Sequence, residues 1–134
     1  MKTSKQTITC AILGFAIILT GCKKYEEGPG FSLRSKKERV ANLWKINYAY
    51  DYKDSVITTA DYAGETWDFT KSGEFIERDN GTIDKTGTWE FISDKEKITI
   101  QFPLTTHTYD ILRLKEKELW LKDSEEELHL VPAN

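Results

Sequence analysis

The chain has few of the residues that enzymes and metal sites most often use. Its 134 residues include two cysteines, Cys10 and Cys22, and two histidines, His107 and His129. Cysteine and histidine are the usual ligands of zinc, and no Gly-x-Ser-x-Gly motif marks a serine nucleophile. We therefore expect no metal centre, no cofactor and no catalytic residues, and a protein that is not an enzyme.

The sequence also lacks a basic excess and a long hydrophobic run. It carries 19 basic and 22 acidic residues, for a formal net charge of −3. Nucleic-acid binding depends on phosphate neutralisation, and binding to anionic lipid depends on basic patches, so this balance argues against both. The single long apolar segment, Ile8 to Leu19, is shorter than the roughly 20 residues that span a bilayer.

The chain begins instead with the features of a secretory signal. Lys2 and Lys5 precede the apolar segment, and small residues follow it. The stretch Leu19-Thr20-Gly21-Cys22 resembles a bacterial lipobox. The resemblance implies cleavage before Cys22, diacylglycerol on its sulfur and acylation of its amino group. Two such attachments would anchor the protein stably to a membrane and leave no free thiol.

Residues 1–21 are therefore expected to be a signal peptide, and residues 22–34 a lipidated flexible linker, since Gly28, Pro29 and Gly30 oppose helix and strand. Lys23 follows the modified cysteine. An aspartate there commonly retains lipoproteins at the inner membrane, so Lys23 favours the outer membrane. Periplasmic display and cell-surface display both remain open. Residues 35–134 are expected to form one domain.

That domain opens with a short helix and continues as β-structure. Ser35 and Glu38 have the spacing of a capping box, and Val40 and Leu43 share one face of the helix that follows. Large apolar residues then alternate with polar ones, which is typical of strands with one buried face. The residues expected to point inward on the first strand are Trp44, Ile46, Tyr48, Tyr50 and Tyr52.

The alternation predicts seven further strands with short polar turns. Their inward residues include Trp67 and Phe69, Trp89 and Phe91, Ile98 and Ile100, and paired leucines near the C-terminus, whereas the third strand is ambiguous between Phe75 and Ile76. Asn80-Gly81 suits a type I′ hairpin. Near-sequential hairpins favour an all-β, eight-stranded up-and-down antiparallel barrel with the short helix at one end, which leaves no exposed sheet edge.

Several short motifs resemble the small lipocalin-like lipoproteins of Bacteroidota. They are Asn42-Leu43-Trp44, Trp67-Asp68-Phe69, Gly73-Glu74-Phe75, Gly87-Thr88-Trp89-Glu90-Phe91, Leu119-Trp120-Leu121 and Leu128-His129-Leu130. The resemblance covers about residues 38 to 132 and implies the same eight-stranded barrel. It departs from lipocalins proper at Asn42, where they have glycine, and in lacking an arginine after Arg113.

Inward aromatic residues are the candidate ligand site. They are Trp44, Tyr48, Tyr50, Trp67, Phe69, Phe75, Trp89, Phe91 and Tyr109. An eight-stranded barrel either fills with side chains or holds one small ligand, and the sequence leaves both open. Three tyrosines on one strand favour a partly wet interior, because a buried phenol needs a hydrogen-bond partner.

Two functions follow from these residues. The first is a lipid-anchored, non-enzymatic binding protein, expected to be monomeric, that holds a small hydrophobic or amphipathic ligand in its barrel beside the loop from Asp51 to Gly64. The second is a scaffold at the cell surface that docks an envelope protein or a glycan. The outward Trp120 motivates this alternative, because exposed aromatic residues often anchor interfaces.

Overall fold

The structure is a computed structural model that describes residues 26–27 and 34–134. Helix α1 (Lys36–Val40) begins at Ser35, where the capping box predicts it. The backbone N–H of Glu38 donates to Ser35 Oγ at 3.2 Å, and the N–H of Ser35 donates to Glu38 Oε2 at 2.7 Å. These two bonds satisfy donors that the start of a helix leaves unpaired, so a helix of only five residues has a defined beginning.

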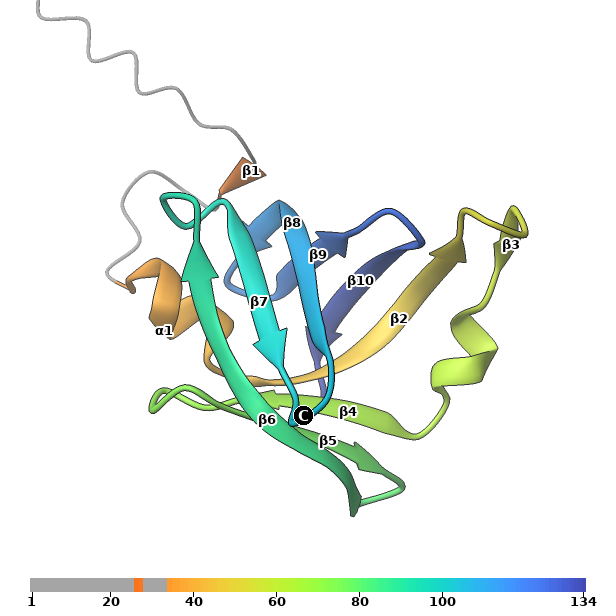
Figure 1. Cartoon of the computed structure of the whole chain (residues 1–134), viewed down its shortest axis with the longest axis horizontal. Helices are drawn as coiled ribbons and strands as arrows, with labels where there is room; N and C mark the ends of the chain where they lie inside the picture. Colours follow the sequence, from red (N-terminus) through yellow and green to blue (C-terminus); the bar gives the residue numbers. More distant parts are fainter. Residues whose placement is uncertain (1–25, 28–33) are drawn as a thin grey trace, which may run out of the picture.

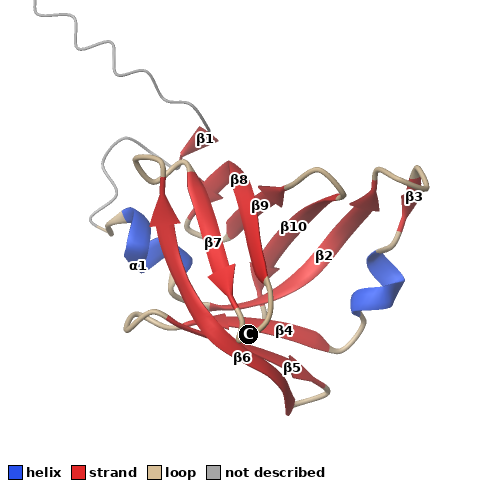
Figure 2. Cartoon of the chain, viewed as in Figure 1, coloured by secondary structure: helices blue, strands red, loops and turns tan. Residues whose placement is uncertain are grey.

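Eight strands form a closed antiparallel barrel, as the hairpin spacing predicts (Figures 1 and 2). Each strand pairs with its neighbours in the order β8-β7-β6-β5-β4-β2-β10-β9, and pairing of β8 with β9 closes the cylinder. The eight are β2 (Leu43–Asp51), β4 (Glu65–Phe69), β5 (Glu74–Asp79), β6 (Thr82–Ile92), β7 (Lys97–Gln101), β8 (Thr106–Lys115), β9 (Glu118–Lys122) and β10 (Glu126–Pro132).

Two further strands of two residues each extend the sheet. β1 (Glu26–Glu27) pairs in parallel with β8 at Arg113 and Leu114, and β3 (Val56–Ile57) pairs with the end of β2. A 3₁₀ helix, η1 (Thr59–Tyr62), follows β3 in the long connection to β4. β1 thus ties the start of the described chain to one particular end of the barrel.

The two ends of the barrel differ. At the closed end, α1 packs against the strands: Trp44 Nε1 donates to the Val40 carbonyl at 2.8 Å, and buried Arg39 donates to the Leu114 carbonyl at 3.3 Å. At the open end, β2 and β4 diverge, because they pair only at Leu43↔Asp68 and Trp44↔Trp67. Figure 1 shows α1 at the left end, and η1 and β3 at the right, open end.

The first strand departs from strict alternation. Tyr48 pairs with His129, but Ile46 pairs with the next residue, Leu130, so Asn47 is an extra residue in β2. A bulge of this kind exchanges the two faces of the strand beyond it. Trp44 and Ile46 therefore point inward, but the next inward residue is the buried Ala49.

The prediction that Tyr48, Tyr50 and Tyr52 point inward is therefore wrong. Tyr48 packs against His129 on the outer face, with ring centroids 4.7 Å apart. The Tyr52 hydroxyl donates to outward Glu127 at 2.5 Å. The one-residue bulge accounts for all three changes, and it leaves no mark in the spacing of apolar residues.

The other strands keep the predicted phase. Phe75 is buried and Ile76 is half-buried on the opposite side of β5, which settles the ambiguous third strand. The Asn80-Gly81 turn has φ values of 47° and 84°, the positive pair that a type I′ turn requires. Trp67, Phe69, Phe75 and Trp89 then meet inside the barrel through edge-to-face and tilted contacts, with centroid distances between 5.0 and 6.4 Å.

Candidate functional site

Aromatic rings fill the barrel where a ligand was predicted. Six of the nine candidates belong to the buried core: Trp44, Trp67, Phe69, Phe75, Trp89 and Tyr109. Phe91 is partly buried against this core, and Tyr48 and Tyr50 lie on the outer face. Of the nine, Tyr109 is the one that lines the interior cavity described below. Rings that meet edge to face stabilise the packed interior and leave the open end as the site to consider.

Trp120 lies on the outer face, as predicted, in a stack that crosses four strands. Its ring is parallel to His129, with centroids 3.9 Å apart, and the Arg113 guanidinium lies 3.8 Å from the centroid of the same ring. Arg113 and His129 come from the strands on either side of β9, so they cover opposite faces of the indole. Docking through Trp120 would use its edge, and loss of crosslinks in Trp120→Ala tests that alternative.

A cavity of about 230 Å³ lies inside the open end of the barrel. We call it the inner cavity. Three carboxylates line it, Glu65 on β4, Glu77 on β5 and Glu126 on β10, together with Lys85 on β6. Its remaining lining residues are Tyr62, Ile100, Phe102, Thr105, His107 and Tyr109. These charged and polar groups come from elements spread around the barrel, and they converge where those elements reach the open end.

Hydrogen bonds hold each carboxylate of the inner cavity in place. The Tyr62 hydroxyl donates to Glu126 Oε2 at 2.6 Å, and the Tyr109 hydroxyl donates to Glu126 Oε1 at 3.1 Å. Trp67 Nε1 donates to Glu65 Oε1 at 2.5 Å. Lys85 Nζ lies 2.8 Å from Glu77 Oε1, and Glu77 is only 8% exposed. Glu65 and Glu126 are thus oriented by neutral donors, whereas Glu77 is paired with a cation.

This arrangement shifts the proton affinities of three groups. Burial, followed by the bond to Glu126, raises the pKa of Tyr62, and burial together with the nearby charge of Glu126 raises the pKa of Tyr109. Both phenols therefore remain donors at physiological pH. Burial also raises the pKa of Glu65, and the charge of Glu77 adds to the effect, whereas the Trp67 bond and Lys85 oppose it.

Glu65 should therefore make the fold less stable as the pH rises. The folded state holds the Glu65 proton more tightly than the unfolded state does, so stability falls between the unfolded pKa, about 4.3, and the raised folded pKa. We expect Glu65→Gln to raise Tm at pH 7 and to leave Tm nearly unchanged at pH 4. Thermal unfolding across this range tests it, with Glu90→Gln on the exposed face of β6 as the control. A lower Tm at pH 7 would contradict this origin of the penalty.

The acidic residues of the inner cavity were not predicted from the sequence. Glu126 in particular was taken as solvated charge in a turn, and it points inward instead. A signal was present, since each carboxylate continues the inward phase of its strand. Glu65 lies two residues before Trp67, Glu77 two after Phe75 and Glu126 two before Leu128. Side chains two apart on a strand share a face.

Two other expectations concern features that the inner cavity does not involve. Cys22 lies outside the described residues, so its modification stays a prediction. Among residues 26–27 and 34–134, no group of three or more histidine, cysteine or acidic side chains is placed to hold a metal ion. No helix in the described part of the chain is long and apolar enough to cross a membrane.

Comparison with known proteins gives structural matches only. No family model matches the chain, and no curated protein matches its sequence significantly. A lipocalin-like protein from Bacteroides uniformis superposes with a TM-score of 0.57 at 16% identity, over 70% of this chain and 98% of the other. An uncharacterised protein from Bacteroides eggerthii gives 0.56 at 13% identity, over 69% and 98%. With the closed eight-stranded barrel and its N-terminal helix, these matches show that the chain has a lipocalin-like fold.

Proposed function

We propose that this protein is a lipid-anchored envelope lipoprotein whose barrel binds a small molecule at its open end without catalysis. The observation that carries the proposal is the inner cavity, where a few oriented polar groups converge among aromatic and apolar side chains. Small-molecule sites typically combine an apolar lining with a few convergent polar groups. The rest of the barrel interior is occupied by the core rings.

The lining favours an amphipathic ligand over a wholly apolar one. Glu65, Glu77 and Glu126 face the inner cavity, and a hydrocarbon placed against them would remove charged groups from water with no compensating bonds. Ile100 and the rings of Phe102 and Tyr109 supply apolar contact on the same walls. A ligand with both a polar and an apolar part matches this lining.

The position of β1 supports an anchor that leaves the open end accessible. β1 pairs with β8 at Arg113 and Leu114, beside the hairpin at the closed end. Four residues of chain separate Cys22 from Glu26, which is at most about 14 Å when extended. A lipid on Cys22 would hold the closed end toward the outer membrane and direct the open end away from it. Metabolic labelling with an alkyne fatty acid tests the anchor: Cys22→Ala should lose the label and Cys10→Ala should keep it.

Titration of the full-length chain with a panel of amphiphiles tests ligand binding. We expect a saturable change in tryptophan emission, because Trp67 donates to Glu65 at the edge of the inner cavity. Glu126→Gln should weaken binding about tenfold or more, as is typical when an oriented charged acceptor is removed. Glu125→Gln changes the neighbouring exposed side chain and should leave the affinity unchanged. No emission change with any member of the panel would overturn the proposal.

A further inference from the structure

Three hollows meet at the open half of the barrel wall. A groove of about 330 Å³, which we call the loop groove, is lined by Lys85, Thr86 and the turn from Phe102 to Thr105. A larger groove of about 620 Å³, the wall groove, runs over β5 and β6 toward Phe102 and Pro103. Phe102 lines both grooves and the inner cavity as well. These shared residues make the interior and the outer surface continuous at this ring.

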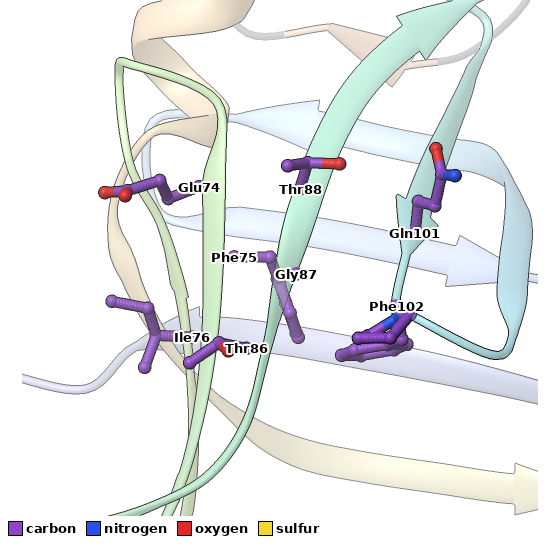
Figure 3. A pocket seen from close by; sticks show the side chains of 9 residues that line it. Glu74, Phe75, Ile76, Thr86, Gly87, Thr88, Gln101 and Phe102 are labelled. Atoms are coloured by element: carbon purple, nitrogen blue, oxygen red, sulfur yellow. The ribbon is translucent and has the colours of Figure 1, made fainter.

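An incomplete strand pairing produces this opening. β6 pairs with β7 from Thr88 to Ile92, but its first residues, Thr82 to Gly87, have partners only on β5. After Gln101 the chain leaves the sheet in a turn, closed by a bond from the Phe102 N–H to the Thr105 carbonyl at 2.8 Å. Figure 3 shows Gly87 on β6 with Phe75 on one side and Phe102 on the other. The barrel wall is therefore open between β6 and this turn.

The two sides of Phe102 differ in chemistry. Inside, Glu65, Glu77 and Glu126 face Lys85 and His107, so acidic groups outnumber basic ones in the inner cavity. Outside, the loop groove is bordered by Pro103 and by Leu104, which is 96% exposed at the tip of the turn. An apolar side chain this exposed has no folding role, and it extends the apolar surface of Phe102 outward.

The size of the inner cavity limits what it can hold. Its volume of about 230 Å³ is below the range typical of ligand sites, roughly 300 to 1,000 Å³. A molecule that fills it has its remaining atoms in the adjoining groove. That molecule then meets oriented carboxylates first and apolar side chains second, as it passes from inside to outside.

We propose that the inner cavity and the loop groove form one site for a small amphiphile with an ammonium head, with the head among the carboxylates and the tail passing Phe102 to lie along Leu104. This inference rests on the proposed function and names its ligand class. Glu65 and Glu126 accept bonds from neutral donors, so their charges are oriented but not neutralised. An ammonium group neutralises them, and the rings of Phe102 and Tyr109 add cation–π attraction.

The same lining disfavours other head groups. An anionic head would face three carboxylates across a partly desolvated cavity, where like charges repel more strongly than in water. A neutral alcohol could donate one hydrogen bond but would neutralise no charge. The site therefore separates amines from acids and alcohols with the same tail.

Six-carbon probes test the head group on the full-length chain at pH 7. We expect hexylamine to bind at least about tenfold more tightly than hexanol or hexanoate, because hydrogen bonds to charged groups are the strong ones. Equal binding of hexanoate or hexanol would overturn the ammonium preference while leaving ligand binding at this end intact. Failure of every probe, together with no response to the amphiphile panel, would overturn the proposed function as well.

Two surface variants test the path of the tail. We expect Leu104→Ser to weaken hexylamine binding several-fold and to leave the binding of ethylamine unchanged, since only the longer chain reaches beyond Phe102. Ile57→Ser removes another exposed apolar side chain, on β3, and should change neither affinity. Both positions are exposed, so folding is retained. If Leu104→Ser and Ile57→Ser behave alike with hexylamine, the tail does not follow the loop groove.

Discussion

Replacing Trp44 with alanine is expected to lower the free energy of unfolding by about 3–5 kcal/mol, a large part of the stability of a domain of this size. The side chain is fully buried where β2 leaves α1, and its Nε1 donates to the Val40 carbonyl at 2.8 Å. Alanine would leave a cavity at the closed end and an unpaired carbonyl on the helix. Both losses follow from the same position, so the effect should exceed that of any surface change.

Urea unfolding measures this loss, with Trp120→Ala as the matched variant. Trp120 is half-exposed between His129 and Arg113, and such stacked pairs are worth about 0.5–1.5 kcal/mol each beyond the area they bury. Trp44→Ala should therefore be clearly the more damaging of the two. Equal losses, or a larger loss for Trp120→Ala, would mean that the stability of the barrel does not depend on the packing of its closed end.

Replacing Gly87 with alanine is expected to destabilise the barrel by about 1–3 kcal/mol, or more if the sheet cannot adjust. A Cβ on Gly87 would lie 2.3 Å from the Gln101 carbonyl oxygen and 3.1 Å from Phe102 Cδ1. The oxygen belongs to the backbone beside the last β6–β7 pair, Thr88↔Gln101, so it can move only by disturbing that pair. The opening beside Phe102 therefore depends on a residue without a side chain.

Thr86→Ala is the control for this change, because it alters the exposed neighbour of Gly87 on the same strand. Chemical denaturation of the two variants should separate them by at least about 1 kcal/mol. Hydrogen exchange at Gln101 and Phe102 should also be faster in Gly87→Ala, since this turn must shift. Native exchange rates together with native stability would show that the contact at Gly87 is looser than the structure indicates.

Much of the fold could be predicted because its determinants are local. Ser35 and Glu38 cap the helix within one turn, and Asn80-Gly81 specifies its hairpin through backbone conformation alone. The inward phase of Trp67, Trp89 and the paired leucines follows from period-two spacing, since one side of each strand must be buried. These features need no knowledge of distant residues, and the structure confirms each of them.

The bulge at Asn47 and the inner cavity could not be predicted in the same way. The extra residue in β2 is defined by its register against β10, some eighty residues away, so the first strand alone gives no sign of it. The inward carboxylates required a different assumption. Charged residues at strand ends were taken as solvated, whereas Glu65, Glu77 and Glu126 find partners across the barrel in Trp67, Lys85 and two tyrosines.

Charge at the open end is costly for folding, which supports a role in binding. Burial raises the pKa of Glu65, so its ionised form is disfavoured in the folded protein at neutral pH. A strand end that served packing alone would be more stable with glutamine or an apolar residue there. Carboxylates that are oriented at some cost to stability are typical of sites that recognise a ligand, as functional residues often are.

The indole N–H resonances of the four tryptophans give the most direct test of ligand binding in the inner cavity. Trp67 Nε1–H donates to Glu65 at its edge, whereas those of Trp44 and Trp89 donate to the Val40 and Thr70 carbonyls, and Trp120 lies on the outer face. On addition of hexylamine to the ¹⁵N-labelled chain, the Trp67 signal should move and saturate while the signals of Trp44, Trp89 and Trp120 stay in place. A stationary Trp67 signal, or movement of Trp120 alone, would contradict binding in the inner cavity.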